Sequence, residues 1–112
     1  MADEKYEGWK NYPTWNYKLW IDNDQGSQEY WRTMAEDAYD SAKKEGSISK
    51  KDMAWMTLAD MLKEALEENN PITEPTMYSD MMQYAIDSID YREIAKALID
   101  EMLENRNYKP RT

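Results

Sequence analysis

The chain has 112 residues, a formal net charge of −9 and no cysteine. This length fits one domain, and the acidic balance argues against direct binding to nucleic acid or to anionic membranes, both of which require Lys and Arg. The lack of cysteine excludes disulfides and thiol chemistry. No apolar run approaches the ~20 residues that span a membrane, and the polar N-terminus has no signal-peptide pattern, so we expect a cytoplasmic protein.

The residue types favour helices. The sequence has no Val, Phe or His, whereas Met, Leu, Ala, Glu and Lys are plentiful. Because Val and Phe form strands well and the abundant residues are good helix formers, we predict an all-α fold. We expect a single compact domain of about five helices over residues 9–106, packed around a Trp- and Met-rich core. A flexible N-terminus is expected at 1–8 and a flexible tail at 107–112.

The first two helices are predicted to flank an aspartate-rich turn. The first begins at Pro13 or Thr14, because proline is favoured in the first turn of a helix. Residues 22–26, DNDQG, end it with residues typical of turns. The second is expected to begin with Ser27 as its N-cap and to end at Gly46. The apolar stripe of the first helix consists of Trp15, Leu19, Trp20 and Ile21.

A third and central helix has the clearest start signal. Ser49 with Asp52 resembles a capping box, and Ile48 with Met53 resembles a hydrophobic staple. Apolar residues recur at helical spacing as far as residues 69–71, Asn-Asn-Pro, which end the helix.

The last two helices are predicted to be separated by a sharp break. The fourth starts near Thr76, and Asp90 with Glu93 forms a second capping box that opens a fifth helix ending near Asn105. The expected inward face of the fourth helix is Tyr78, Met81, Met82, Ala85, Ile86 and Ile89, with Met81 and Met82 filling gaps in the core. That of the fifth is Ile94, Ala95, Leu98, Met102 and Leu103.

Catalysis and metal binding have weak support. Without His and Cys, the chain lacks the commonest general base and the strongest nucleophile. Carboxylate pairs four residues apart, such as Asp60 with Glu64 or Asp100 with Glu104, are more typical of a solvated helix face than of an acid/base dyad. The segment 22–24, Asp-Asn-Asp, resembles the start of a calcium loop, but the following Gly and Glu positions do not fit. We therefore expect no enzymatic activity, no metal and no cofactor.

The acidic residues are concentrated in the second half of the chain. Between Asp60 and Glu104 there are twelve acids and three bases, which accounts for the whole net charge. Most such surfaces are merely solvated. The functional alternative is an imitation of a phosphate array, which occupies a basic groove on a nucleic-acid-handling protein. The candidate acidic residues for partner binding are Asp87, Asp90, Glu93, Asp100 and Glu104.

Aromatic residues are concentrated between Gly8 and Tyr30, and Trp31 follows directly. Trp and Tyr most often enter the core because each ring buries a large area, and Trp9, Tyr12, Trp15, Trp20 and Trp31 are the candidates. Trp and Tyr also dominate binding hot spots, and five Trp are difficult to bury fully in a domain of this size. The candidate aromatic residues for partner binding are Trp9, Tyr12, Tyr17 and Tyr30.

The run GWKNYPTWN at 8–16, followed by LWIDND at 19–24, resembles a family of small acidic proteins of unknown function associated with bacteriophages, plasmids and prokaryotes. The segments 70–71, 77–80 and 90–95 resemble later parts of the same family less specifically. At positions 17–18, Tyr-Lys, the sequence departs from the family pattern, which has small apolar residues there. The resemblance implies no activity and no catalytic residues. It implies a setting among mobile-element genes, where many short acidic proteins block restriction or CRISPR effectors.

These observations predict a non-enzymatic, protein-binding accessory factor of a phage or mobile element. Its most specific form is an anti-defence inhibitor, anti-restriction or anti-CRISPR, that acts through an acidic, nucleic-acid-mimicking surface. The expected partner is a protein with a basic surface, such as a nucleic-acid-handling defence effector, and neither nucleic acid itself nor a membrane. The alternative is a structural or oligomerisation module, for example a homodimer, whose acidic face only keeps it in solution.

Overall fold

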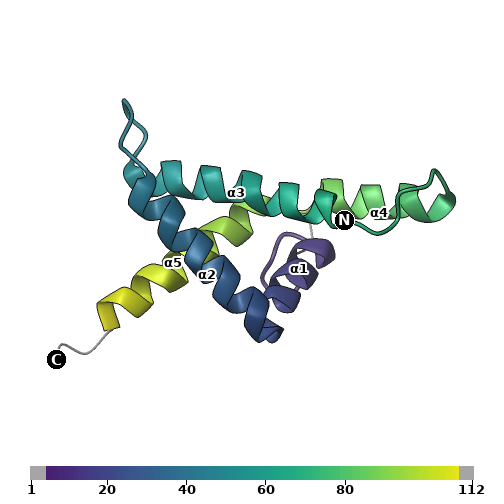
Figure 1. The fold of residues 1–112 in the computed structure, drawn as a ribbon, viewed down its shortest axis with the longest axis horizontal. Coiled ribbons are helices and arrows are strands. Elements are labelled where there is room, and N and C mark those ends of the chain that lie inside the picture. Colours follow the sequence, from purple (N-terminus) through teal and green to yellow (C-terminus); the bar gives the residue numbers. More distant parts are fainter. Residues whose placement is uncertain (1–4, 109–112) are drawn as a thin grey trace.

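The computed structural model describes residues 5–108, and this range forms five helices in a single domain. The predicted all-α fold is confirmed. The helices are α1 (Tyr12–Asn23), α2 (Gln25–Ser41), α3 (Lys50–Glu68), α4 (Met77–Ser88) and α5 (Tyr91–Tyr108) (Figure 1). α2, α3 and α5 pack against one another, α1 contacts α2, α4 and α5, and α4 contacts α1 and α3. None of the helices in this range has the length and apolar character needed to cross a membrane.

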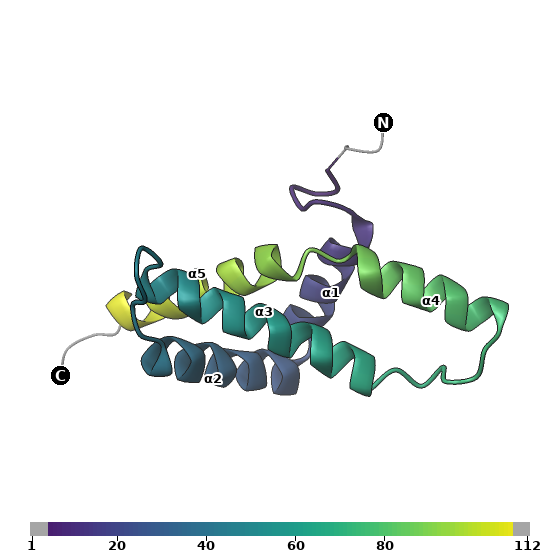
Figure 2. The same ribbon diagram turned by 90° about the horizontal axis from the view of Figure 1, so that it is seen from above.

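The domain is more elongated than a compact sphere of the same mass. Its radius of gyration is 15.6 Å and its extents are 54 × 35 × 29 Å, whereas about 13 Å is typical of a domain of this length. Figures 1 and 2 show that α4 and the connector before it lie at one end of the long axis, beyond the bundle of α2, α3 and α5. The fold therefore combines a packed bundle with a projecting helix.

α1 begins at Tyr12, one residue before Pro13 and two before Thr14, the two predicted starts, because Asn11 caps it. The Asn11 Oδ1 accepts hydrogen bonds from the backbone N–H of Thr14 at 3.0 Å and from the Thr14 hydroxyl at 2.6 Å. Tyr12 is then the first helical residue, and Pro13 lies in the first turn, where its missing N–H has no helical partner to lose.

The boundaries of α2 differ from the prediction at both ends. Asp24, and not Ser27, is the N-cap, because its carboxylate accepts the N–H of Ser27 at 2.8 Å. The helix ends at Ser41, so the prediction that Gly46 terminates it was wrong. Gly46 instead has a φ of +58° inside the turn 45–48, whose ends are joined by two backbone hydrogen bonds. Both a helix stop and a tight turn use the left-handed conformation that glycine adopts, so the residue type did not distinguish them.

α3 and α4 begin where predicted, with different degrees of capping. Ser49 caps α3 by accepting the N–H of Asp52 at 3.1 Å. The predicted capping box is only half formed, since the Asp52 carboxylate accepts the indole N–H of Trp55 at 2.8 Å instead. α4 has a complete box, in which the Thr76 and Ser79 side chains each accept the other's backbone N–H.

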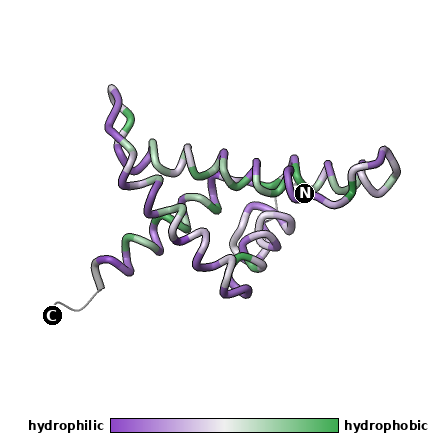
Figure 3. Tube along the Cα trace, viewed as in Figure 1, coloured by the Kyte–Doolittle hydropathy of each residue, from purple (hydrophilic) through white to green (hydrophobic). Residues whose placement is uncertain are grey.

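The core is mainly aliphatic, and the expectation of a Trp- and Met-rich core holds only in part. Trp31 and Met102 are the buried Trp and Met of the described residues, while other Trp and Met side chains pack partly buried around them. Alanines on α2, α3 and α5 allow these helices to approach closely, and large indoles are seldom fully buried. Figure 3 shows hydrophobic and hydrophilic residues alternating along α3 and α5. The core cluster is Ile21, Trp31, Ala35, Ala38, Ala54, Leu58, Ala59, Leu62, Ile94, Ala95, Leu98, Ile99 and Met102.

Candidate partner-binding surface

The Asn-Tyr-Pro-Thr segment forms a hydrogen-bonded junction between three helices. Thr14 is fully buried, and its hydroxyl accepts the backbone N–H of Asp90 at 2.9 Å while donating to Asn11. The Asn11 side-chain amide donates to the carbonyl of Ser88 at 2.7 Å. These bonds satisfy backbone N–H and C=O groups that have no helical hydrogen-bond partner where α4 ends and α5 begins. The polar residues of this motif therefore position α4 and α5 relative to α1.

Two of the five candidate acidic residues, Asp90 and Glu93, accept backbone hydrogen bonds at the start of α5. Asp90 accepts the N–H of Glu93 at 3.1 Å, which confirms the predicted break between α4 and α5. The capping box expected there is not completed, because the Glu93 carboxylate accepts the backbone N–H of Lys10 at 2.9 Å. Both carboxylates line an open pocket of about 550 Å³ together with the cations Lys5, Lys10, Arg92 and Lys96. Cations outnumber carboxylates at this position, so it is not an acidic array.

The other three candidate acids are spread over the molecule. Asp87 is exposed on α4, where it accepts a hydrogen bond from Gln83 at 2.9 Å. Asp100 on α5 pairs with Lys51 of α3 at 2.7 Å. Glu104 lines a pocket of about 220 Å³ between α1, α2 and α5. Within the described residues, no group of three or more Asp and Glu side chains is placed to hold a metal ion.

The four candidate aromatic residues divide into two pairs. Tyr12 and Tyr30 are 51% and 53% exposed and remain accessible to a partner. Trp9 and Tyr17 are partly buried against the core. The Tyr17 hydroxyl donates to the Leu62 carbonyl at 2.9 Å, and burial raises the pKa of Tyr17 to about 12. The Tyr17 hydroxyl is therefore hydrogen-bonded to the backbone of α3.

The most exposed apolar side chains are ones that sequence reasoning placed inward or overlooked. Trp20 is 67% exposed, so its assignment to the core was wrong. The same holds for Tyr78 and Met81, which are 66% and 61% exposed on the predicted inward face of α4, where Ile86 alone is fully buried. Helical spacing identifies a stripe but not the surface that covers it. Two further residues of α4 are exposed without having been predicted to be, Met77 at 59% and Tyr84 at 78%.

A continuous acidic segment lies between Lys63 and Arg92. Residues 64–90, here called the acidic arm, contain seven acids and neither Lys nor Arg. They form the C-terminal turns of α3, the connector 69–76 and α4. The candidate acids included Asp87 and Asp90 of this span but not its other five acids, although the absence of bases over the span is visible in the sequence. The exposed acids of the arm are Glu64, Glu67, Glu68, Glu74, Asp80 and Asp87.

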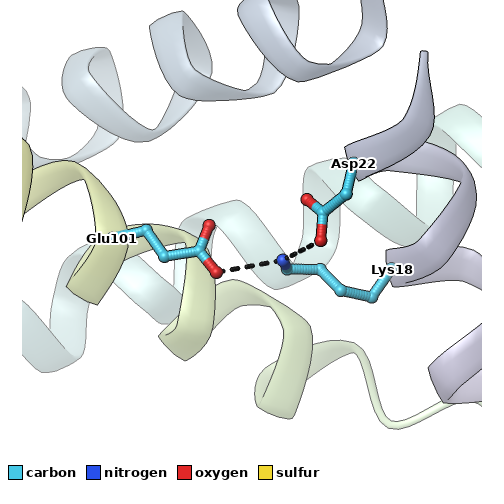
Figure 4. Close-up of polar contacts among 3 residues, drawn as sticks. All are labelled: Lys18, Asp22 and Glu101. Carbon is cyan, nitrogen blue, oxygen red and sulfur yellow. Dashed lines mark hydrogen bonds and ion pairs between the residues drawn. The ribbon is translucent and has the colours of Figure 1, made fainter. Parts of the chain in front are cut away.

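A buried lysine holds α1 against α5. Lys18 points inward and is only 4% exposed. Its ammonium group lies 2.7 Å from Asp22 and 3.0 Å from Glu101 (Figure 4). Burial lowers the pKa of Lys18, but hydrogen bonds to the two carboxylates raise it by more, so the pKa lies above its ordinary value. A lysine held in the protonated form is an anchor and not a nucleophile.

Comparison with known proteins assigns the chain to a family and supplies no activity. No curated protein and no solved structure matches it. A family model does match over residues 2–108, which is nearly the whole sequence. The expected membership in an uncharacterised family is thereby confirmed. The chain belongs to the family of unknown function DUF7249.

Proposed function

We propose that this protein is a non-enzymatic accessory factor that binds a protein partner with a basic surface. The observation that carries the proposal is the acidic arm, in which six exposed carboxylates occur without a single base. An unbalanced surface of this kind attracts a partner rich in Lys and Arg, and it repels acidic proteins and nucleic acids.

The most specific form of the proposal is inhibition of a nucleic-acid-handling protein. A nucleic-acid channel is lined by Lys and Arg that replace the counterions of phosphates, and the exposed carboxylates of the acidic arm would occupy such a channel in place of phosphates. The resemblance to proteins of phages and mobile elements supports an anti-defence role, with a restriction or CRISPR effector as the partner. The exposed Tyr12 and Tyr30 offer apolar contacts outside the arm.

The proposal is tested by capture from a nuclease-treated prokaryotic lysate on the immobilised protein. We expect retained partners to elute with heparin, a polyanion that competes for nucleic-acid channels, and to elute at high salt because exposed charges are screened. Elution by neither treatment would contradict the electrostatic mechanism.

A matched pair of triple variants locates the charge. Glu64→Gln, Glu67→Gln and Glu68→Gln remove three exposed carboxylates from the acidic arm, whereas Glu29→Gln, Asp37→Asn and Glu45→Gln remove three exposed carboxylates elsewhere. Capture should weaken for the arm variant and persist for the control. Equal loss for both variants would show that only net charge matters.

A second candidate function is that of an oligomerisation module, and it is favoured by the exposed Met and Tyr side chains of α4. Exposed apolar patches commonly mark contacts between chains. Light scattering over a range of concentrations decides this point. A dimer that persists at high salt would favour the module, and a monomer at all concentrations would exclude it.

A further inference from the structure

We infer that α4 is the element of this protein that docks on the partner, with its exposed Met and Tyr face laid on an apolar surface edged by Lys and Arg. The inference rests on the proposed function and adds the binding element and its chemistry. It is carried by how α4 is attached, by the spacing of its exposed residues and by the sign of the charges beside them.

α4 is attached to the rest of the domain through its last turns. Ile86, 2% exposed, is its fully buried residue, and it lies outside the main core cluster. The hydrogen bonds that hold the helix also fall here, from the Tyr91 hydroxyl to the Ile86 carbonyl at 2.6 Å and from Asn11 to the Ser88 carbonyl at 2.7 Å. Residues 77–85 contain no buried side chain. The first two turns of α4 therefore have an uncovered side, and Figure 2 shows them reaching away from the bundle.

The exposed apolar residues of α4 form one stripe. Met77, Met81 and Tyr84 are separated by four and three positions, which places them on the same face of a helix, and Tyr78 widens that face. Their exposed fractions lie between 59% and 78%. Tyr and Met combine apolar area with adaptable packing, as is typical of helices that bind in a groove on a partner.

The edge of this stripe carries charges of one sign. Asp80 lies three positions after Met77 and four before Tyr84, and Asp87 lies three after Tyr84, so both carboxylates flank the stripe. Two antiparallel copies of α4 would bring these aspartates together, and the acidic arm has no Lys or Arg to compensate them. Like charges brought together at an interface are unfavourable. A second copy of the chain is therefore a poor occupant, and a partner whose apolar strip is bordered by Lys and Arg is a complementary one.

The docking is tested with a defined probe, a fluorescent amphipathic helical peptide of Leu and Lys with all Leu on one face. A peptide of the same composition in scrambled order keeps the charge and lacks the face. Fluorescence anisotropy should show tighter binding of the amphipathic peptide. Tyr78→Ser or Met81→Ser should weaken that binding by about tenfold or more, the effect of removing a hot-spot residue. Binding of the scrambled peptide should change little with either substitution.

Trp20→Ser is the matched control, because Trp20 on α1 is 67% exposed and Tyr78 is 66% exposed. It should leave peptide binding unchanged, and circular dichroism should show the native helix content in all variants. Equal weakening by Trp20→Ser, or no weakening by the α4 variants, overturns the inference. A concentration-dependent dimer that Tyr84→Ser abolishes also overturns it in favour of a second copy.

The charge variant separates the two proposals. If Glu64→Gln, Glu67→Gln and Glu68→Gln weaken peptide binding while the α4 serines do not, α4 is not the docking element and the acidic-surface function stands. If neither set of changes alters binding, both proposals fail. If both the charge variant and the α4 serine variants weaken peptide binding, the result supports a combined apolar and acidic contact.

Discussion

The bundle of α2, α3 and α5 and the projecting α4 use similar residues in opposite ways. Met102 on α5 is 2% exposed, whereas Met81 on α4 is 61% exposed, although both lie on helical stripes of apolar residues. In the bundle, each of the three helices covers part of the other two. α4 packs on α1 and α3 and accepts a hydrogen bond from Tyr91 of α5, and Ile86 is its one fully buried residue. An amphipathic pattern thus requires a surface to cover it, and for α4 the fold supplies that surface over one side only.

The contrast has a simple packing reason. A short chain buries about two-thirds of its surface, so there is enough core to enclose a few helices and not every apolar stripe. Alanines bring α2, α3 and α5 close together, and no residue of α4 belongs to the core cluster that these helices share. The apolar face of α4 is then left for solvent or for a partner.

The largest expected effect comes from truncating a side chain inside the bundle. Leu62→Ala removes a fully buried side chain from α3 and should lower the free energy of unfolding by about 2–5 kcal/mol. Met81→Ala on α4 should change it by less than about 0.5 kcal/mol, because the side chain is largely exposed. Chemical denaturation measures both values. Similar losses for the two variants would mean that α4 is covered in solution.

A smaller effect is expected at the junction that fixes α4. Thr14→Val keeps the shape of a fully buried side chain but leaves the N–H of Asp90 without its acceptor. The free energy of unfolding should fall by about 1–3 kcal/mol, the penalty for an unpaired buried polar group. Hydrogen exchange should also speed up at the α4–α5 junction. Thr14→Ser retains the hydroxyl and serves as the control. Its free energy of unfolding should fall by less than that of Thr14→Val.

The smallest effect appears only at alkaline pH. The pKa of Tyr17 is raised from 10.0 to about 12 in the folded protein, mainly by burial. The neutral phenol is thus favoured by folding, so its contribution to stability is complete below pH 10.0 and is lost as the pH rises through about 12. Unfolding of the wild type should therefore become easier over this range more steeply than unfolding of Tyr17→Phe.

Tyr84→Phe provides the comparison on the projecting helix. Its side chain is 78% exposed, so removing the hydroxyl should change the free energy of unfolding by less than about 0.5 kcal/mol. Denaturation at several pH values measures the slopes. If Tyr17→Phe retains the wild-type slope, the Tyr17 hydroxyl is not buried against α3. Tyr91 remains in both variants, and burial also raises its pKa, so part of the alkaline loss should persist.

Local signals in the sequence located the helices well and the site poorly. The cap at Ser49, the start at Thr76 and the break at Asp90 follow from a few adjacent residues, and all three are present. The candidate site at Asp90 and Glu93 required knowledge of distant partners. The Glu93 carboxylate accepts the backbone N–H of Lys10, and the Thr14 hydroxyl accepts the backbone N–H of Asp90. Lys10 and Thr14 lie more than seventy residues earlier in the chain than these partners. No spacing rule within a helix indicates such contacts.

The sequence by itself determined that the chain is helical, where most helices begin and that its second half is acidic, because propensity, capping and charge are properties of neighbouring residues. Only the tertiary structure decided which apolar stripe is covered and which carboxylates stay free. Burial depends on what packs against a face, as Tyr78 and Trp20 show by facing solvent and Lys18 by facing inward. The same stripe pattern therefore serves as core on α5 and as exposed surface on α4, according to whether another helix reaches it.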